Sequence, residues 1–218
     1  MPRGSNYGSD YWVTYSYKLK RQLSLYSMLE FYQFIILEMD PKVELFCEQP
    51  IKIKGVFDGK KKNSVFDFWV KYKDESEEFQ EVKSSSDLTG DDRSAVRAKE
   101  QIAFQKKWCS DHGYNYKVIS EDDIFDGQHR IPNLKILHSH LLRLGGVDET
   151  IANRLCKKLK SKKLSLEEIF ILNYAEKAEM MGIIAYLYYN GMVIIDLNKH
   201  PLDKDTEVIL CEEENIIL

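Results

Sequence analysis

Long hydrophobic runs are missing from the sequence. No uninterrupted apolar stretch approaches the roughly 20 residues that a helix needs to cross a bilayer, so we expect no membrane partner. Met1–Asp10 also lacks the apolar core of a secretory signal. Pro2–Ser5 could be native sequence or a cloning remnant. We therefore expect a cytoplasmic protein.

Cysteine and histidine are few and scattered. The four cysteines form no CxxC pair: Cys47, Cys109, Cys156 and Cys211. Their spacing argues against a zinc site and against a thioredoxin-like redox pair, and we interpret them as small core residues. His138 and His140 are two apart on a predicted helix, so they cannot share a ligand face.

An excess of positive charge is also missing, because the net charge is −4 at pH 7. DNA binding draws on phosphate neutralisation by Lys and Arg, so this chain should bind duplex weakly when alone. Either it never meets DNA or a partner delivers the DNA to it. The one clear positive patch is Arg154–Lys163, which is either a solvated helix end or a contact for DNA or an acidic partner.

What is present is an ordinary globular composition over 218 residues, enough for one domain or two small ones. Apolar residues at three- and four-residue steps predict a helix over Leu23–Met39, with Ser24 as its N-cap and Asp40-Pro41 as its end. Arg93–His112 predicts a second helix, which Gly113 ends as a C-cap. Its expected core side is Val96, Ala103 and Trp108.

Short strands are expected between and after these helices. Their predicted ranges are Val43–Phe46, Ile51–Val56, Val65–Tyr72, Phe79–Lys83 and Tyr116–Ile119. Asp58-Gly59 predicts a hairpin turn with Lys60–Asn63 as a basic tip, and Ser84–Asp92 predicts a polar loop. The predicted order along the chain, which is helix, strands, helix and strand, indicates a compact α/β domain with a mixed sheet.

A predicted linker at Ser120–Pro132 separates this domain from a helical region. The expected helices are Leu134–Leu144, Glu149–Lys160, Leu166–Leu172 and Ala175–Tyr189. Alternating residues at 193–197 and 208–210 then predict a hairpin. Helices followed by a hairpin are the order of a winged-helix domain. We therefore predict two domains, at residues 1–122 and 123–218.

The residues that could do chemistry converge on neighbouring strands. Glu81 and Lys83 are two apart in a strand and share a face, whereas Val82 points into the core and leaves its backbone carbonyl near them. Asp67 lies on what should be the adjacent strand. Glu30 lies opposite the main apolar stripe of its helix, at the helix rim or turned into a pocket.

Two carboxylates and a lysine in this arrangement suit phosphodiester hydrolysis. Asp67 and Glu81 can hold Mg²⁺, a hard cation that takes few protein oxygens, polarises a phosphate and acidifies a bound water. Lys83 can steer that water or offset charge in the transition state. Glu30 can be a further ligand or orient a metal-bound water.

Each of these residues also has a plainer interpretation. A carboxylate such as Asp67 between aromatic residues is costly to bury unless it is paired, and perturbed carboxylates cluster at functional sites. Glu81 and Lys83 alone would more often be an exposed ion pair that contributes little. Glu30 alone would be a surface residue of a helix.

Several stretches of the sequence, which include these four residues, resemble the TnsA endonuclease subunit of heteromeric bacterial cut-and-paste transposons. They are Leu25–Glu30, Asp40–Val43, Cys47–Pro50, Phe66–Phe68, Glu81–Lys83 and, at the end of the catalytic domain, Tyr116–Ser120. The likeness is most specific across Leu25–Lys83. Beyond Ile131–Leu134 it rests mainly on the order of helices and hairpin.

The resemblance implies a restriction-endonuclease-like PD-(D/E)xK fold followed by a winged-helix-like α+β C-terminal domain. It implies bacterial, Mg²⁺-dependent cleavage of the non-transferred strand at transposon ends, with Mn²⁺ able to substitute. The implied partners are DNA, a DDE transposase (TnsB) and an ATP-dependent regulator (TnsC), the last through the C-terminal domain. Glu30, Asp67 and Lys83 match the family's catalytic residues, and Glu81 fills a place that can be Glu or Gln. Phe66 stands where the fold's name has proline.

Two other interpretations stay open at this point. The chain could be another nuclease of the same superfamily, such as a restriction enzyme or a junction resolvase, because function does not follow from fold. It could instead be a non-catalytic adaptor of a transposition complex that docks through its C-terminal domain. An intact set of three acids and a lysine argues against the adaptor.

Overall fold

The computed structural model describes residues 11–211, which divide into two compact units. The first comprises residues 11–38 and 42–124, and the second comprises residues 39–41 and 125–211. Pro2–Ser5 and the stretch assessed for a secretory signal lie outside the described residues. Within residues 11–211, no helix has the length and apolar character needed to cross a membrane.

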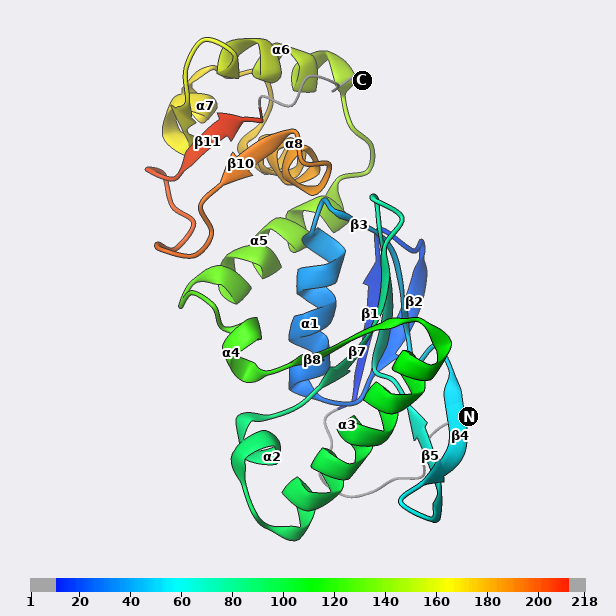
Figure 1. Cartoon of the computed structure of the whole chain (residues 1–218). Helices are drawn as coiled ribbons and strands as arrows, with labels where there is room; N and C mark the ends of the chain where they lie inside the picture. The colour runs from blue at the N-terminus through cyan, green and yellow to red at the C-terminus, as the bar shows by residue number, and fades with distance from the viewer. Residues whose placement is uncertain (1–10, 212–218) are drawn as a thin grey trace. The chain divides into compact units, whose positions relative to one another are not determined.

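The centre of the first unit is a mixed four-stranded sheet in the order β3-β6-β7-β8 (Figure 1). Strands β3 (Val43–Glu48), β6 (Phe68–Tyr72) and β7 (Glu77–Val82) are antiparallel neighbours, and β8 (Asn115–Ile119) runs parallel to β7. A helix-covered sheet of this kind is a mixed α/β architecture, as expected.

Helices α1 (Met28–Met39) and α3 (Arg93–His112) cover opposite faces of this sheet (Figure 1). Phe79 of β7 packs its ring on Trp108 of α3, with the ring centroids 6.0 Å apart. The next residue, Gln80, accepts a hydrogen bond from Gln33 of α1 at 2.8 Å. Because adjacent strand residues point to opposite faces, the two helices must lie on the two sides of the sheet.

The expected start of the first helix was wrong. Leu23 and Leu25 belong to β2 (Arg21–Leu25), which pairs with β1 (Trp12–Ser16), a strand that the sequence reading missed. The helix begins at Met28, and Ser27 rather than Ser24 accepts a hydrogen bond from its first turn. Leu23 and Leu25 are buried at every second position, which is a strand pattern. Because the helical pattern follows directly along the sequence, the two together resembled one longer helix.

The predicted turn at Asp58-Gly59 is confirmed, with φ values of +48° and +71° at its two residues. It joins β4 (Lys52–Phe57) to β5 (Lys60–Val65), so Lys60–Asn63 is strand and not the expected basic tip. The predicted strand Val65–Tyr72 is also broken, because β5 ends at Val65 and β6 begins at Phe68. The break is where the chain leaves the hairpin and enters the main sheet.

Two further expectations for this unit needed correction. The stretch Ser84–Asp92 contains the short helix α2 (Ser85–Thr89), because the Ser84 side chain caps it by accepting a hydrogen bond from the Asp87 amide. Helix α3 has the predicted bounds and ends at Gly113, whose φ of +75° suits glycine. Of its expected core side, Trp108 does pack against the core, whereas Val96 and Ala103 are exposed. The residues of α3 that are buried are Ala95, Ala98, Phe104, Gln105 and Cys109.

The second unit is helical with a small antiparallel sheet in the order β10-β11-β9. Along the chain its elements are α5 (Arg130–Arg143), α6 (Glu149–Leu159), β9 (Leu164–Ser165), α7 (Leu166–Ile171), α8 (Lys177–Tyr189), β10 (Val193–Ile195) and β11 (Glu207–Leu210). Strand β9 was not predicted. The expected linker contains α4 (Glu121–Ile124) of the first unit and the beginning of α5.

Helices α5 and α8 pack against each other in the core of the second unit. A Cβ atom added at Gly182 of α8 would lie 2.8 Å from Leu144 Cδ1, so glycine permits this close approach. The core that results is almost entirely aliphatic, with Leu137, Leu141 and Leu155 fully buried. All four cysteines are free thiols, of which Cys109 and Cys156 are buried.

Candidate active site

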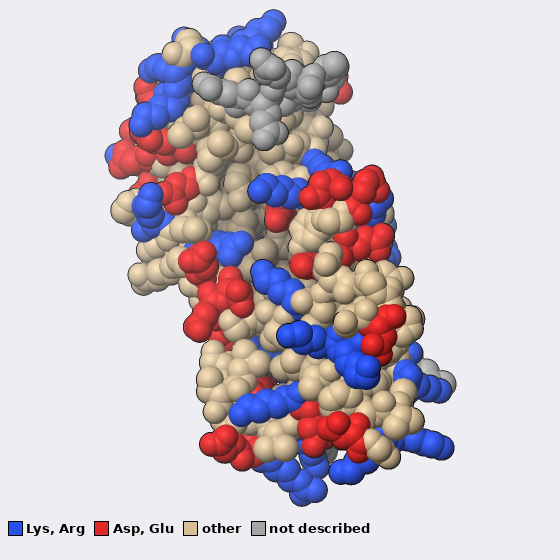
Figure 2. Space-filling model, in the orientation of Figure 1, with Lys and Arg blue, Asp and Glu red and all other residues tan. Residues whose placement is uncertain are grey.

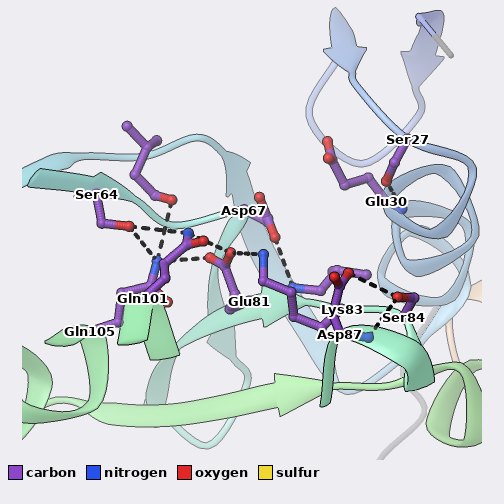
Figure 3. Close-up of polar contacts among 12 residues, drawn as sticks. Ser27, Glu30, Ser64, Asp67, Glu81, Lys83, Ser84, Asp87, Gln101 and Gln105 are labelled. Atoms are coloured by element: carbon purple, nitrogen blue, oxygen red, sulfur yellow. Dashed lines mark hydrogen bonds and ion pairs between the residues drawn. The ribbon is translucent and has the colours of Figure 1, made fainter. Parts of the chain in front are cut away.

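One cavity of about 730 Å³ in the first unit brings the predicted residues together. Glu30 of α1, Asp67, Glu81 of β7 and Lys83 all line it (Figure 3). Together these residues span 53 positions of the chain, from Glu30 to Lys83. The sheet and the two helices that cover it therefore create a shared site.

Asp67 occupies the junction between the β4–β5 hairpin and the main sheet. Its amide donates to the Gln80 carbonyl at 3.2 Å, and its own carbonyl accepts from the Gln49 amide at 2.9 Å. Its side-chain Oδ2 accepts from the Val82 amide at 2.8 Å (Figure 3). Although Asp67 is not part of β6, two of these bonds hold it beside β7 and the third ties it to Gln49, which follows β3. Its side chain is buried.

The Glu81 carboxylate is 1% exposed and is held by three donors (Figure 3). Lys83 Nζ and Gln101 Nε2 donate to Oε1 at 2.5 Å and 2.7 Å, and Gln105 Nε2 donates to Oε2 at 2.8 Å. A carboxylate oxygen has about two lone pairs, so these bonds leave one lone pair, on Oε2. The orientation of Glu81 is thus fixed from two elements, β7 and α3.

Gln101 and Gln105 are site residues that the sequence reasoning missed. The Tyr116 hydroxyl donates to Gln105 Oε1 at 2.8 Å, so the amide NH₂ of Gln105 must face Glu81. Both glutamines also donate to Ser64 Oγ, at 3.2 Å and 3.0 Å. Their signal in the sequence is the four-residue spacing, which places both on one face of a helix.

Besides lining the cavity, Glu30 makes hydrogen bonds at the start of α1. Its Oε2 accepts from the Tyr26 amide at 2.9 Å, and its own amide donates to Ser27 Oγ at 3.0 Å. These bonds satisfy backbone donors at the start of α1, as acidic residues in a first helical turn commonly do. The position of Glu30 is therefore explained in part by helix capping alone.

The electrostatics of the cavity are dominated by the burial of Asp67 next to other carboxylates. Burial raises the pKa of Asp67 well above its ordinary value, and the negative charges of Glu81 and Glu30 raise it further. Lys83 and the Val82 amide act in the opposite direction on this pKa, but they do not compensate. Burial would lower the pKa of Lys83, yet Glu81 and Asp67 outweigh it and the pKa is raised.

Val82 is buried as predicted, and its amide contacts Asp67. The proposed role of its carbonyl as a metal ligand remains a prediction. Across residues 11–211, no three His, Cys, Asp or Glu side chains form a ready-made cluster for a metal ion.

A mixed four-stranded sheet with flanking helices fits a restriction-endonuclease-like fold. Residues 40–121 match the family model described as TnsA-like endonuclease N terminal. Over this stretch the chain is similar to the N-terminal domain of TnsA-like endonucleases, which suggests a nuclease of a transposase family. No curated protein matches the chain significantly. Asp67, Glu81 and Lys83 lie within the matched stretch, whereas Glu30 lies outside it.

Proposed function

We propose that this chain is the DNA-cutting subunit of a heteromeric bacterial transposase. It cleaves the non-transferred strand at transposon ends during cut-and-paste transposition. The observation that carries this proposal is the convergence of three acids and a lysine on one cavity within a TnsA-like endonuclease domain. Such perturbed, cavity-lining carboxylates are typical of catalytic sites.

The donor set suits a hard divalent cation, which we propose to be Mg²⁺, with Mn²⁺ as a substitute. When ionised, Glu30, Asp67 and Glu81 carry three negative charges against the single positive charge of Lys83. Burial raises the pKa of Asp67, and the negative charges of Glu81 and Glu30 raise it further. Mg²⁺ usually takes only one or two protein carboxylates and completes its shell with water and phosphate, so a full protein cage is not required.

Asp67 and Glu81 are the proposed ligands, with Glu30 and the Val82 carbonyl as additional ones. Glu81 can offer the remaining lone pair of Oε2 while Gln105 keeps that oxygen in place. The bound cation would supply polarisation of the scissile phosphate and a lowered pKa of an attacking water. Lys83, held against Glu81, would offset the negative charge that develops on the phosphate.

The second unit supports a partner-binding role. Its order α6-β9-α7-α8-β10-β11, with β11 between β9 and β10, favours a winged-helix-like domain. DNA-reading domains of helix-turn-helix type insert their second helix into the major groove. Here that helix is α8, and Met180, Ile183 and Ile184 are among its many buried residues. We therefore propose that this domain contacts the ATP-dependent regulator, while a DDE transposase brings the transposon end.

The test is a nicking assay with Mg²⁺, the cognate DDE transposase and a transposon-end duplex. Asp67→Ala and Lys83→Ala should each abolish nicking and leave assembly with the transposase intact. Glu38→Gln is a matched control, because Glu38 is fully buried, bonds to Ser16 Oγ at 2.6 Å and does not line the cavity. Continued nicking by both site variants would show that the site assignment is wrong.

A further inference from the structure

The β4–β5 hairpin is a two-stranded sheet of its own, beside the four-stranded sheet (Figure 1). Residues 52–65 contain five lysines and one acidic residue, Asp58, in a chain whose net charge is −4. Charge of one sign is therefore concentrated on this hairpin. The proposed nuclease chemistry leaves these lysines unexplained.

One face of the hairpin is anchored on α3. Ile53 is 2% exposed and belongs to a core cluster with Phe104. A Cβ atom added at Gly55 would lie 3.2 Å from the Phe104 ring, so glycine lets the strand approach α3 closely. The Phe57 ring also meets Phe104 edge-on, with the centroids 6.1 Å apart. These contacts fix which face of the hairpin points outward.

The outer face carries Lys52, Lys54 and Lys61. Strand alternation places Lys52 and Lys54 opposite Ile53, and the pairing Val56↔Lys61 brings Lys61 to the same face. None of the three makes an ion pair with any residue between 11 and 211. Lys62, on the inner face, is different because it pairs with Glu100 of α3.

This basic face is continuous with the cavity. Lys52 lines the cavity itself, and Lys61 lies towards the Asp58-Gly59 turn, at the far end of the strand pair. Lys and Arg side chains project at the edge of the molecule where β4 and β5 lie (Figure 2). Alternate residues of a strand are about 7 Å apart, so the face offers cations at regular steps leading to the cluster of acids.

We propose that the outer face of β4–β5 holds the phosphate backbone of duplex DNA next to the scissile bond. This inference rests on the proposed nuclease function. The acids of the cavity repel phosphate, so binding energy for the backbone must come from cations outside them. Through Lys52, the outer face reaches the cavity that holds these acids.

The composition of this face favours DNA over a protein partner. Protein interfaces are depleted in lysine and enriched in aromatic residues. The outward positions of the two strands are Lys52, Lys54, Val56, Lys61, Asn63 and Val65, with no aromatic side chain among them. Lysines and an amide match the donors that proteins direct at DNA phosphates.

The test compares two triple variants of the full chain. The first is Lys52→Gln/Lys54→Gln/Lys61→Gln, and the second removes the same charge elsewhere in the unit, by Lys106→Gln/Lys107→Gln/Lys117→Gln. None of the control lysines lines the cavity. Affinity for a short duplex is measured by fluorescence anisotropy in EDTA across a salt series. Nicking is measured separately with Mg²⁺ and the cognate transposase.

The hairpin variant should bind duplex roughly tenfold more weakly at low salt, and its log-log salt slope should fall by about 2 to 3. The control variant should stay close to wild type. Equal losses in both variants, or no measurable duplex binding by wild type at low salt, would overturn the inference. A loss of transposase binding with unchanged duplex binding would instead assign the face to a protein and also overturn it.

The nicking arm separates this inference from the function on which it rests. If wild type fails to nick in the assembled complex, the proposed function is wrong whatever the hairpin variant does in EDTA. If wild type nicks and the hairpin variant nicks and binds duplex equally well, only the hairpin inference is wrong.

Discussion

The two units of this chain differ most in what they bury. Among residues 11–211, the first unit buries eight polar or charged residues, and the second buries two, Asn133 and His138. Burying a polar group is costly unless hydrogen bonds replace those of water. The first unit therefore contains more buried polar groups that need hydrogen-bond partners than the second does.

Asn133 illustrates a buried polar group with a purely structural role. Its amide donates to the carbonyls of Leu197 and His200 at 3.0 Å and 2.7 Å, and its oxygen accepts from the Leu202 amide at 2.9 Å. All these bonds go to the loop between β10 and β11. They satisfy the side chain and hold the loop, and no titratable group is involved.

Glu38 and Asp67 show that burial of a carboxylate alone does not mark a site. Burial raises the pKa of both. Glu38, however, accepts bonds from the Ser16 hydroxyl and the Lys18 amide at 2.6 Å and 2.9 Å, which offset part of this effect. Asp67 faces other carboxylates across a cavity. The distinguishing feature is therefore the repulsion from Glu81 and Glu30, which Lys83 and the Val82 amide offset only in part.

The largest expected effect comes from Asp67→Asn, which keeps the shape of the side chain and removes its charge. Nicking should fall on the order of 10³-fold. The melting temperature at neutral pH should stay the same or rise. The pKa of Asp67 is raised in the folded state, so its ionised form costs stability above the ordinary pKa, and asparagine removes that cost. Thermal unfolding of the variant and of Glu38→Gln, followed with the nicking assay, checks both parts. A large drop in melting temperature would contradict this account of the cavity.

The second prediction concerns the pH stability of the other unit. Burial lowers the pKa of His138 from 6.5 to about 4. The unfolded chain binds the proton more tightly, so the second unit should keep full stability above pH 6.5 and lose up to about 3 kcal/mol as the pH falls towards 4. His138→Gln should flatten this dependence in part, since the pKa of His140 is also lowered.

The three tryptophans allow this loss to be assigned to a unit. Trp12, Trp69 and Trp108 all lie in the first unit. Denaturant unfolding between pH 7 and pH 4.5, followed by tryptophan fluorescence and by far-UV circular dichroism, should show a shift of the circular dichroism signal first. A shift confined to tryptophan fluorescence would mean that His138 does not set the pH dependence.

The sequence predicted the N-terminal domain well where the pattern was local. Arg93–His112, with Gly113 as its cap, has the observed bounds because capping and helical periodicity need only neighbouring residues. The convergence of Asp67, Glu81 and Lys83 on one cavity was predictable from strand alternation and from a carboxylate placed between aromatic residues, and their role stays a prediction. The break at Phe66-Asp67 was missed, because it depends on where the hairpin leaves the main sheet.

The core side of α3 shows why the rest could not be predicted. Val96 was expected in the core and is 47% exposed, whereas Gln105 is fully buried. A hydropathy pattern assigns glutamine to the surface, so it cannot find a helix face turned towards a buried carboxylate. Only the three-dimensional partner, Glu81, makes glutamine the suitable residue. Local sequence patterns therefore could not predict that Gln105 lines up with Glu81.

The smallest predicted effect tests the contact between Gln105 and Glu81, by comparison with a second buried glutamine, Gln33. Gln105→Ala removes the donor on Glu81 Oε2, and loss of such a supporting hydrogen bond typically costs 10- to 100-fold in activity or metal affinity. Gln33→Ala is the matched control, because Gln33 is also buried but bonds to Gln80 on the opposite face of the sheet. Both variants should lose about 1–3 kcal/mol of stability.

Only Gln105→Ala should change the Mg²⁺ concentration at which nicking is half-maximal, since a purely structural glutamine would not move this value. Equal Mg²⁺ dependence in both variants would mean that Gln105 supports the fold and not the carboxylate. A raised Mg²⁺ requirement in Gln105→Ala alone would instead separate the two kinds of buried polar group in the first unit. It would divide them into those that stabilise the sheet and those that orient Glu81 for its cation.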